Sequence, residues 1–513
     1  MSDDNNSCQS DEPLEDELYD YCSSATITEE GIHEIIDRHK ESAPDNFLHV
    51  SDYEFFHHAC RNETVTEGII QCLLEYFPDA VNDADDDECL PLHYACRNNN
   101  ELGIIRLLID AAPDSVRHTK DNHGDTPLHK LCANTELEEK NALQISKLLL
   151  EKYPESIRHM NNDGQLPLHY ACKNCNVSLG IIELLLDVAP DLVRHEDDNG
   201  YVPLHCLCSN TELDDTTRLD ILKLLLEKHP ESTQHVGAEG HLPIHLAAVF
   251  TESPEFCSWL LEAYPGSDRI ADNSGMLPFH HACAHNTVEA VEYWYNVYPD
   301  AVDHPSTSGL YPVHIAIGVS PDKIQALKIV KFLLDCDPRV KFQEVAQSEQ
   351  SLLHFACRFD CGQSNTAVSL KMIEAIYDAH PELIRKEDDD GQLLLHQLCA
   401  VPPSYDETRR IAILKLLLEK YPESIRHESG KGFLPIHNAL MMAESPAICR
   451  MLIDAYPGSE RIPSNSTRML PFHYACMNNT LDTVEYLYNL YPDAIEQTAS
   501  HQESILFIVQ SEV

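Results

Sequence analysis

A short phrase centred on histidine occurs twelve times in this chain of 513 residues. It is clearest as LPLHYAC at Leu90–Cys96 and as LPFHYAC at Leu470–Cys476. Successive histidines of the phrase are 34 to 42 residues apart, a period typical of solenoids built from small stacked units. The motif histidines are His57, His93, His129, His169, His205, His245, His280, His314, His354, His396, His437 and His473.

A proline follows each phrase, and its distance to the next motif histidine is nearly constant, at fifteen or sixteen positions. The distance from histidine to proline varies more: it is shortest from His280 to Pro299 and longest from His354 to Pro381. Because proline ends a helix, we expect the length variation to fall within a pair of helices that precedes the proline. The twelve prolines are Pro78, Pro113, Pro154, Pro190, Pro230, Pro265, Pro299, Pro338, Pro381, Pro422, Pro457 and Pro492.

The local chemistry of one unit predicts two helices and a turn. Pro91 suits the first position of a short helix that runs to about Asn98. In Glu101–Ala112 the apolar residues recur at helical spacing, so this longer helix must bury one face. The linking segments contain pairs such as Asp163-Gly164, which tolerate the positive φ of a tight hairpin turn.

These features resemble the ankyrin repeat, whose first helix begins threonine-proline-leucine-histidine and carries an alanine pair; Thr126-Pro127-Leu128-His129 matches that start. The resemblance covers roughly residues 50–497 and implies an all-α, ankyrin-like solenoid of about twelve helix-turn-helix repeats with short hairpin loops. Leucine replaces the threonine in six units and cysteine replaces the second alanine in nine. Losing the hydroxyl cap costs about 1 kcal/mol, whereas burying a leucine returns roughly 1.5–3 kcal/mol.

The chain divides into four parts by composition and periodicity. We expect an acidic, disordered tail at 1–25, because its charge is high and its hydrophobicity low. Residues 26–50 look like a degenerate capping half-repeat that ends at Ala43-Pro44-Asp45. The repeat array takes 51–497, and 498–513 is either a C-terminal tail or a degenerate cap.

Charge and composition restrict the partners. The chain has 85 acidic and 36 basic residues, a formal net charge of −49, which argues against nucleic-acid binding and against an anionic membrane surface. No run approaches the ~20 apolar residues needed to cross a bilayer, and the acidic start does not resemble a signal peptide. Cysteines at repeat-core positions favour a reducing compartment. We expect a cytoplasmic protein, with the nucleus as the alternative.

Nine cysteines stand three residues after a motif histidine and share one helix face with it: Cys60, Cys96, Cys132, Cys172, Cys208, Cys283, Cys357, Cys399 and Cys476. Such His-x-x-Cys faces offer metal ligands. The alternative is that cysteine fills the slot of the second alanine while histidine bonds the adjacent loop. We expect the structural role, no metal and no cofactor, and we keep a metal- or redox-responsive module as the rival function.

No catalytic motif is present: the chain lacks a phosphate-binding glycine loop and a GxSxG elbow, so we predict no enzyme activity and no catalytic residues. The resemblance implies instead a non-enzymatic scaffold or adaptor that binds partner proteins on the concave side of the solenoid. Carried over onto this sequence, the partner-binding positions are Arg61, Arg97, Asn98, Lys173, Asn174, Val249, Phe250, Arg358, Phe359, Met441 and Met442.

Three alternatives stay open at this point. The array could recruit substrates to a larger enzyme complex. The long segments between the helices, such as Phe359–Thr366 and Val401–Thr408, could provide a second contact surface. The end of the chain, Ser511-Glu512-Val513, has the form of a ligand for a PDZ-type domain.

Overall fold

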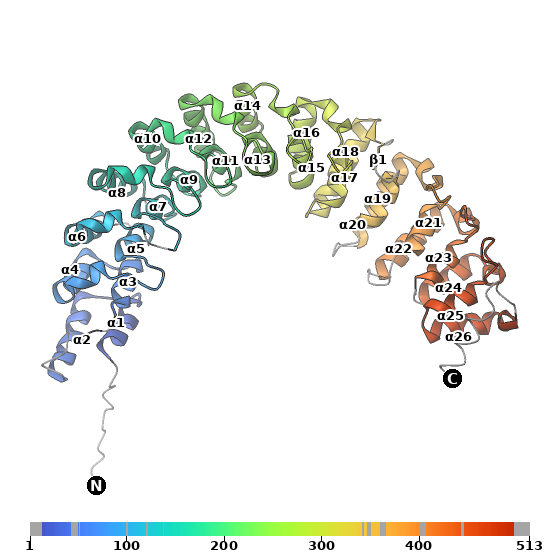
Figure 1. Cartoon of the computed structure of the whole chain (residues 1–513), viewed down its shortest axis with the longest axis horizontal. Helices are drawn as coiled ribbons and strands as arrows, with labels where there is room; N and C mark the ends of the chain where they lie inside the picture. Colours follow the sequence, from blue (N-terminus) through green and yellow to red (C-terminus); the bar gives the residue numbers. More distant parts are fainter. Residues whose placement is uncertain are drawn as a thin grey trace, which may run out of the picture. The chain divides into compact units, whose positions relative to one another are not determined.

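The computed structural model describes residues 13–42, 50, 52–98, 101–119, 122–136, 138–340, 343–345, 350–359, 366–400, 407–442 and 446–496. Its fold class is all-α, with helices that alternate along the chain between two rows (Figure 1). Among these residues the only strands are β1 (Glu344–Val345) and β2 (Gln350–Ser351), a two-residue antiparallel pair. The helical solenoid predicted from the repeats is confirmed.

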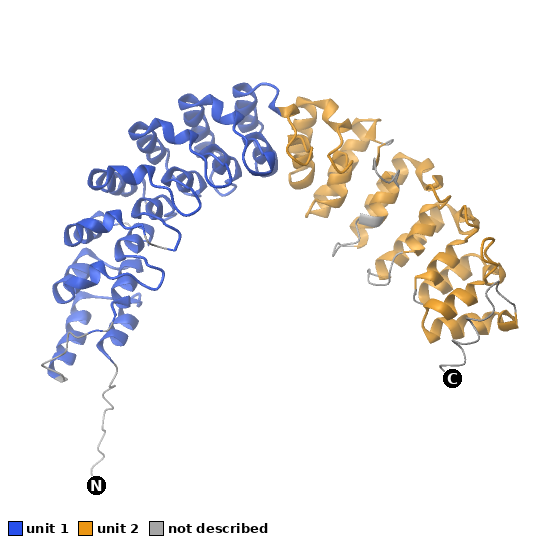
Figure 2. Cartoon of the chain, in the orientation of Figure 1, with its two compact units in different colours: residues 1–267 blue, residues 268–513 orange. Residues whose placement is uncertain are grey.

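The chain forms two compact units, Met1–Ser267 and Asp268–Val513 (Figure 2). In the first unit, the first helices of successive pairs pack on one another and the second helices do the same. The first helices are α1 (Leu14–Cys22), α3 (Glu54–Arg61), α5 (Pro91–Asn98), α7 (Pro127–Cys132), α9 (Pro167–Lys173), α11 (Pro203–Ser209) and α13 (Pro243–Phe250). The second helices are α2 (Glu29–Ser42), α4 (Glu67–Tyr76), α6 (Leu102–Ala111), α8 (Glu139–Lys152), α10 (Leu179–Val188), α12 (Asp215–Lys228) and α14 (Pro254–Ala263).

The second unit repeats this arrangement. Its first helices are α15 (Pro278–His285), α17 (Pro312–Gly318), α19 (Leu352–Phe359), α21 (Leu394–Cys399), α23 (Pro435–Met441) and α25 (Pro471–Asn478). Its second helices are α16 (Val288–Val297), α18 (Lys323–Cys336), α20 (Thr366–Ala379), α22 (Glu407–Lys420), α24 (Pro446–Ala455) and α26 (Leu481–Leu490).

The apolar core lies between the two rows of helices. In α6, Ile104, Ile105, Leu108 and Ile109 are buried, and they recur at the spacing that places them on one helical face. The first-helix cysteines occupy the same layer, because Cys60, Cys96, Cys132, Cys172 and Cys208 are all buried. Each unit therefore completes the core of its neighbours, as expected for a one-dimensional array.

The proline after each second helix starts a further element that the sequence did not predict. In nine of the twelve units it occupies the first position of a 3-10 helix, as in η1 (Pro78–Asn82) and η3 (Pro154–Arg158). Proline suits this position because its missing N–H has no partner there in any case. After Pro265 and Pro457 a glycine of positive φ comes first, Gly266 at 89° and Gly458 at 96°.

The hairpins between units adopt the expected glycine turns, and successive hairpins are bonded to one another. Gly164 has a φ of 72°, and a Cβ placed on it would lie 2.8 Å from the amide nitrogen of Asp198 in the next hairpin. The backbone N–H of Asp198 donates to the carbonyl of Asp163 at 2.9 Å. Glycine is thus needed for both its conformation and the close approach.

The prediction of a disordered tail at 1–25 is wrong for residues 14–22, which form α1. Leu14, Leu18 and Cys22 are buried on one face of this acidic helix, and α1 packs against α3. The burial of this single apolar stripe outweighs the charge of the segment, which was the only feature that we had considered. The proposed half-repeat at 26–50 accordingly contains the second helix of a complete pair, α1 and α2. Residues 1–12 and the C-terminal part 498–513 lie outside the described residues.

Because each pair packs only on its neighbours, we expect chemical denaturation to be broad or to proceed in several steps. A chain that ends after Val302 should keep a folded N-terminal array. Circular dichroism through a urea titration tests both expectations. A truncated protein that is soluble but lacks helical signal would contradict the one-dimensional organisation.

Candidate functional site

The motif histidines are buried and bond the start of their own helix through Nδ1. The backbone N–H of Leu166 donates to Nδ1 of His169 at 3.1 Å, and ten of the twelve motif histidines accept the same bond three residues upstream. The ring therefore caps the helix where leucine has replaced the hydroxyl of threonine. Since a backbone N–H can only donate, Nδ1 is unprotonated and Nε2 carries the hydrogen.

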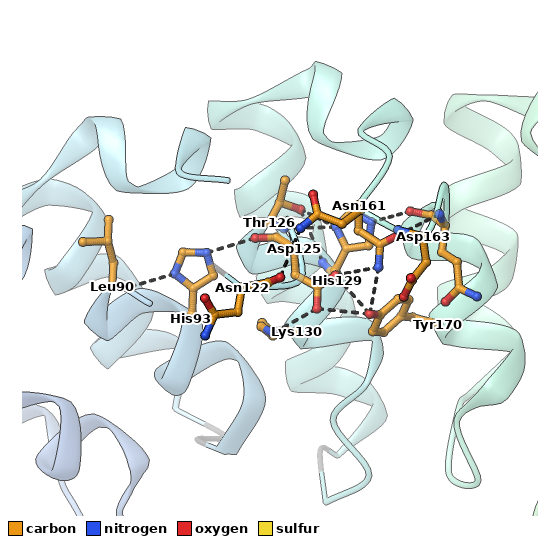
Figure 3. Close-up of polar contacts among 12 residues, drawn as sticks. Leu90, His93, Asn122, Asp125, Thr126, His129, Lys130, Asn161, Asp163 and Tyr170 are labelled. Atoms are coloured by element: carbon orange, nitrogen blue, oxygen red, sulfur yellow. Dashed lines mark hydrogen bonds and ion pairs between the residues drawn. The ribbon is translucent and has the colours of Figure 1, made fainter. Parts of the chain in front are cut away.

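Through Nε2 the same ring bonds the next unit. His93 donates to the carbonyl of Asp125 at 3.2 Å, His129 to that of Gln165 at 3.0 Å, and His169 to that of Tyr201 at 3.1 Å (Figure 3 shows the first of these contacts). Equivalent bonds are made by His57, His205, His280, His396 and His437. One imidazole thus joins its helix to the following hairpin.

Burial lowers the pKa of these rings, because the charged form loses its hydration. The pKa falls to about 4 for His169, His205, His396 and His437, and to about 3 for His280. The structural role predicted for the motif histidines follows from these bonds. It also removes them as metal ligands, since the lone pair of Nδ1 and the hydrogen of Nε2 are both engaged.

The cysteines of the His-x-x-Cys faces are equally unsuited to metal or redox chemistry. Burial raises the pKa of Cys132 to about 12 and that of Cys96 well above its usual range, so both stay thiols at neutral pH. The reactive and metal-binding form of cysteine is the thiolate. The cysteine therefore serves as the small buried side chain that takes the place of alanine.

A buried polar network lies beside these histidines, centred on Asp125 (Figure 3). Its carboxylate accepts from Nζ of Lys130 at 2.9 Å, from Nδ2 of Asn161 at 3.1 Å, and from the hydroxyl of Tyr170 at 3.0 Å. Burial alone would raise the pKa of Asp125, but its bond and charge interaction with Lys130 outweigh the burial and keep the pKa below its usual value. The network is satisfied within the protein and leaves Asp125 no role as a free acid or base.

Asn174, which we expected on the partner-binding surface, is buried and structural. Its Nδ2 donates to the carbonyls of Cys132 at 2.9 Å and Asn134 at 2.8 Å in the preceding unit. Asparagines five or six residues after other motif histidines make equivalent bonds: Asn62, Asn134, Asn210 and Asn479. The expectation failed because an asparagine at a helix end can satisfy the free carbonyls of the neighbouring helix. Its recurrence at fixed spacing was visible in the sequence.

The remaining predicted positions differ in accessibility. Arg61, Arg97 and Lys173 are exposed, and so are Phe250 (42%) and Met442 (39%). Asn98, Val249 and Met441 are half-buried. The side chains of Arg358 and Phe359 lie outside the described part of the chain, as do most of the long inter-helix segments after Phe359 and after Ala400.

Arg61 and Arg97 line one pocket of about 140 Å³ in the first unit, between the ends of α3 and α5 and the hairpins that follow. The guanidinium of Arg61 stacks on the ring of Tyr94, with Cζ 4.6 Å from the ring centroid. His123 and Asn122 complete the rim on the hairpin side. We call this the arginine pocket. Tyr94 follows the motif histidine directly; the sequence analysis missed it because it considered only the residues at the helix end.

Comparison with known families agrees with the repeat architecture. A model of ankyrin repeats, described as three copies, matches residues 56–155 and 138–234. The chain is an ankyrin-repeat protein. Ankyrin repeats generally mediate protein–protein interaction and are typically non-enzymatic. No curated protein matches the sequence. None of the described helices is both long and apolar enough to span a membrane.

The asparagine ladder predicts a difference between two adjacent positions. Asn174→Ala should lower the free energy of unfolding by about 1–3 kcal/mol, because it leaves the buried carbonyls of Cys132 and Asn134 without a donor. Lys173→Ala, on the exposed side of the same helix end, should change it by less than about 0.5 kcal/mol. Urea denaturation measures both values. Equal effects of the two variants would contradict the assignment.

His169→Ala should lower stability by roughly 1–3 kcal/mol, because both the helix start and the next hairpin lose a bond. The tautomer also predicts a pH dependence. Between about pH 6.5, the usual pKa of the unfolded group, and pH 4, the unfolded chain binds more protons than the folded one. Stability should therefore fall as the pH falls, by up to about 1.4 kcal/mol per pH unit for each such histidine. Denaturation at pH 7.0 and pH 5.5 measures the slope, and it should be shallower in His169→Gln; the same slope in both would contradict the assignment.

Proposed function

We propose that this ankyrin-repeat protein is a non-enzymatic scaffold that binds partner proteins along the concave face of its solenoid. The face consists of the hairpins and the exposed ends of the first helices, and we call it the hairpin face. The observation that carries the proposal is the contrast between adjacent positions at each helix end. Asn174 is fixed by the neighbouring unit, whereas Arg61, Arg97 and Lys173 project into solvent and form no ion pair within the described part of the chain.

Two further observations support binding over catalysis. The buried histidines, cysteines and Asp125 have their hydrogen-bonding capacity satisfied within the fold or lie away from solvent. The exposed positions vary in chemistry from unit to unit, with arginine, lysine, phenylalanine and methionine at equivalent helix ends. A rigid frame with a variable surface suits recognition of a partner at several points, with no role for a metal or cofactor.

A charge-reversal experiment in the full chain tests the proposal. The variant Arg61→Glu/Arg97→Glu/Lys173→Glu should lose at least one protein that the unmodified chain captures from native lysate, because contacts on the hairpin face reverse sign. The control Arg106→Glu/Lys140→Glu/Lys147→Glu makes the same change in net charge on exposed positions of the second helices. Quantitative mass spectrometry compares the captured proteins. Identical sets for all three chains would contradict binding at the hairpin face.

The identity of the partners decides between a general scaffold and a subunit that recruits substrates to an enzyme. We propose the cytoplasm as its location, because the thiols of the described residues are free and mostly buried, a state that reducing conditions maintain. Recovery of the same enzyme complex with several otherwise unrelated proteins would favour the recruiting role.

The last three residues, Ser511-Glu512-Val513, lie outside the described residues, and we retain them as a proposed ligand of a PDZ-type domain. Such a peptide would add as a strand to the edge of a sheet, with its free carboxylate bound at the end. A peptide of residues 504–513 should bind at least one domain of a PDZ array, and its Val513→Asp form should bind none. Absence of binding by the unmodified peptide would remove this proposal.

A further inference from the structure

We propose that the arginine pocket binds an anionic group, a carboxylate or a phosphate, on a segment of a partner protein. This inference rests on the proposed function of the hairpin face and names the chemistry that the face recognises. It follows from which hydrogen-bonding groups of the pocket are already used and which are not.

The acidic groups of the pocket are engaged within the fold. Asp85 accepts from the hydroxyl of Tyr94 at 2.6 Å and from the backbone N–H of Cys89 at 2.8 Å. Asp87 accepts from Nδ2 of Asn122 at 2.9 Å. Asp125, which approaches from the next unit, accepts from Lys130 at 2.9 Å. The carboxylates thus have donors already, and a basic ligand would have to compete for them.

The arginines are in the opposite situation. Arg61 and Arg97 are exposed, and no described carboxylate lies within 4.0 Å of either guanidinium. Each guanidinium has five N–H donors in a planar fork that fits two oxygens of a carboxylate or phosphate. The stack on Tyr94 holds the fork of Arg61 in one orientation before a ligand arrives. The unused capacity of the pocket is therefore donor capacity, which an anion fits.

The net charge of −49 does not oppose this assignment at short range. Charges farther away than the Debye length, about 8 Å at physiological ionic strength, are largely screened. A bound oxygen would lie about 3 Å from the guanidinium nitrogens, well inside that distance. The remote acidic surface should reject free anions, so the group has to arrive on a chain that makes further contacts with the hairpin face.

The test uses three pools of fluorescein-labelled peptides with one fixed central residue, glutamate, phosphoserine or glutamine, and random flanking residues. Fluorescence anisotropy measures binding to the full chain, Arg61→Gln, Arg97→Gln and the control Arg106→Gln, at constant ionic strength. We expect an anionic pool to bind the unmodified chain about tenfold more tightly than the glutamine pool, the effect of one charge-assisted hydrogen bond. Both pocket variants should lose this preference, and Arg106→Gln should keep it.

The stronger of the two anionic pools identifies the source of the anion. No preference for either anionic pool, or a preference that survives in Arg61→Gln and Arg97→Gln, would overturn the assignment of the pocket. Its failure is distinguishable from failure of the proposed function. If the charge-reversal variant still loses captured proteins while the pools bind equally, the hairpin face binds partners but this pocket does not read an anion.

A second inference, on independent grounds, concerns the last helix pair. We infer that residues 504–510 of the same chain cover an exposed apolar face of α25 and α26. The face becomes visible by comparison with α15 and α16, an earlier pair whose helices have the same lengths. In this comparison Pro278 corresponds to Pro471 and Val288 to Leu481.

Positions that α17 and α18 cover in the earlier pair are open in the last one. Ala284 of α15 is fully buried, whereas its equivalent Met477 is 51% exposed. Tyr295 of α16 packs its ring against Phe332 of α18 at 5.9 Å, whereas its equivalent Tyr488 is 42% exposed. Cys476 is only partly buried, whereas its equivalent Cys283 is fully buried. No described residue occupies the place of a following helix pair.

The spacing of the repeat identifies the occupant. Each earlier proline of the series is followed by a motif histidine at a nearly constant interval, and the interval from Pro78 to His93, counted from Pro492, leads to Phe507. The surrounding letters, SILFIVQ at Ser504–Gln510, correspond to SLLHFAC at Ser351–Cys357. Phenylalanine keeps the apolar body of the ring at the motif position. Apolar surface for the open face comes from Ile505, Leu506, Ile508 and Val509.

The accessibility of the Cys476 thiol tests this inference in the full chain. N-ethylmaleimide is the probe, and mass spectrometry of the peptides gives the rate of modification. Phe507→Asp should raise the rate at Cys476 severalfold, because an aspartate cannot be buried there. The control Gln502→Asp adds the same charge outside the segment and should leave the rate unchanged. Buried Cys283 and exposed Cys336 report on general unfolding and on reagent activity.

Equal rates at Cys476 in the unmodified chain and in Phe507→Asp would overturn the inference. So would a rate that falls as the protein concentration rises, because the face would then be covered by a second copy of the chain. A chain that ends at residue 497 provides the second variant. It should match Phe507→Asp at Cys476 while Cys283 stays protected, and a Cys476 rate as low as in the unmodified chain would also overturn the inference.

Discussion

The buried imidazole is the interaction on which the array depends. Each ring receives a backbone N–H at the start of its helix and donates to a carbonyl of the next hairpin, so one side chain fixes both the start of its helix and the position of the following unit. Both bonds require the neutral tautomer with hydrogen on Nε2. The depressed pKa of His169 and its equivalents expresses that requirement. A lysine or glutamine at this position would provide only part of the geometry.

This constraint explains why the first helices tolerate leucine in place of threonine. In the Thr126 unit the hydroxyl accepts from the backbone N–H of His129, but the ring of His129 also accepts from the backbone N–H of Thr126. In the units that begin with leucine the second bond remains, as between Leu166 and His169. The helix start therefore loses one of two bonds, and the buried leucine adds apolar contact with its neighbours.

The periodicity of the sequence was sufficient to predict the helix pairs, the glycine turns and the buried roles of histidine and cysteine. It was not sufficient for α1, where Leu14, Leu18 and Cys22 form a stripe too short to stand out against seven nearby acidic residues. Nor did it reveal that Asn174 bonds the preceding unit, because exposure at a helix end depends on the neighbouring backbone and not on the residue type. The arginine pocket needed the structure as well, since Arg61, Tyr94 and Arg97 belong to two helices.

The ends of the first helices show how one short segment can serve both stability and recognition. Counting from the motif histidine, the fifth residue is Asn62, Asn134, Asn174 or Asn210 in four units, and each of these asparagines donates to the preceding unit. The fourth residue, one position earlier, is Arg61, Ala133, Lys173 or Ser209 in the same units. Adjacent residues on a helix point about 100° apart, so the side chain that staples two units leaves its neighbour free to face solvent. Substitution at the fourth position therefore leaves the ladder intact, and duplication of units can change the binding surface without changing the bonds that hold the array together.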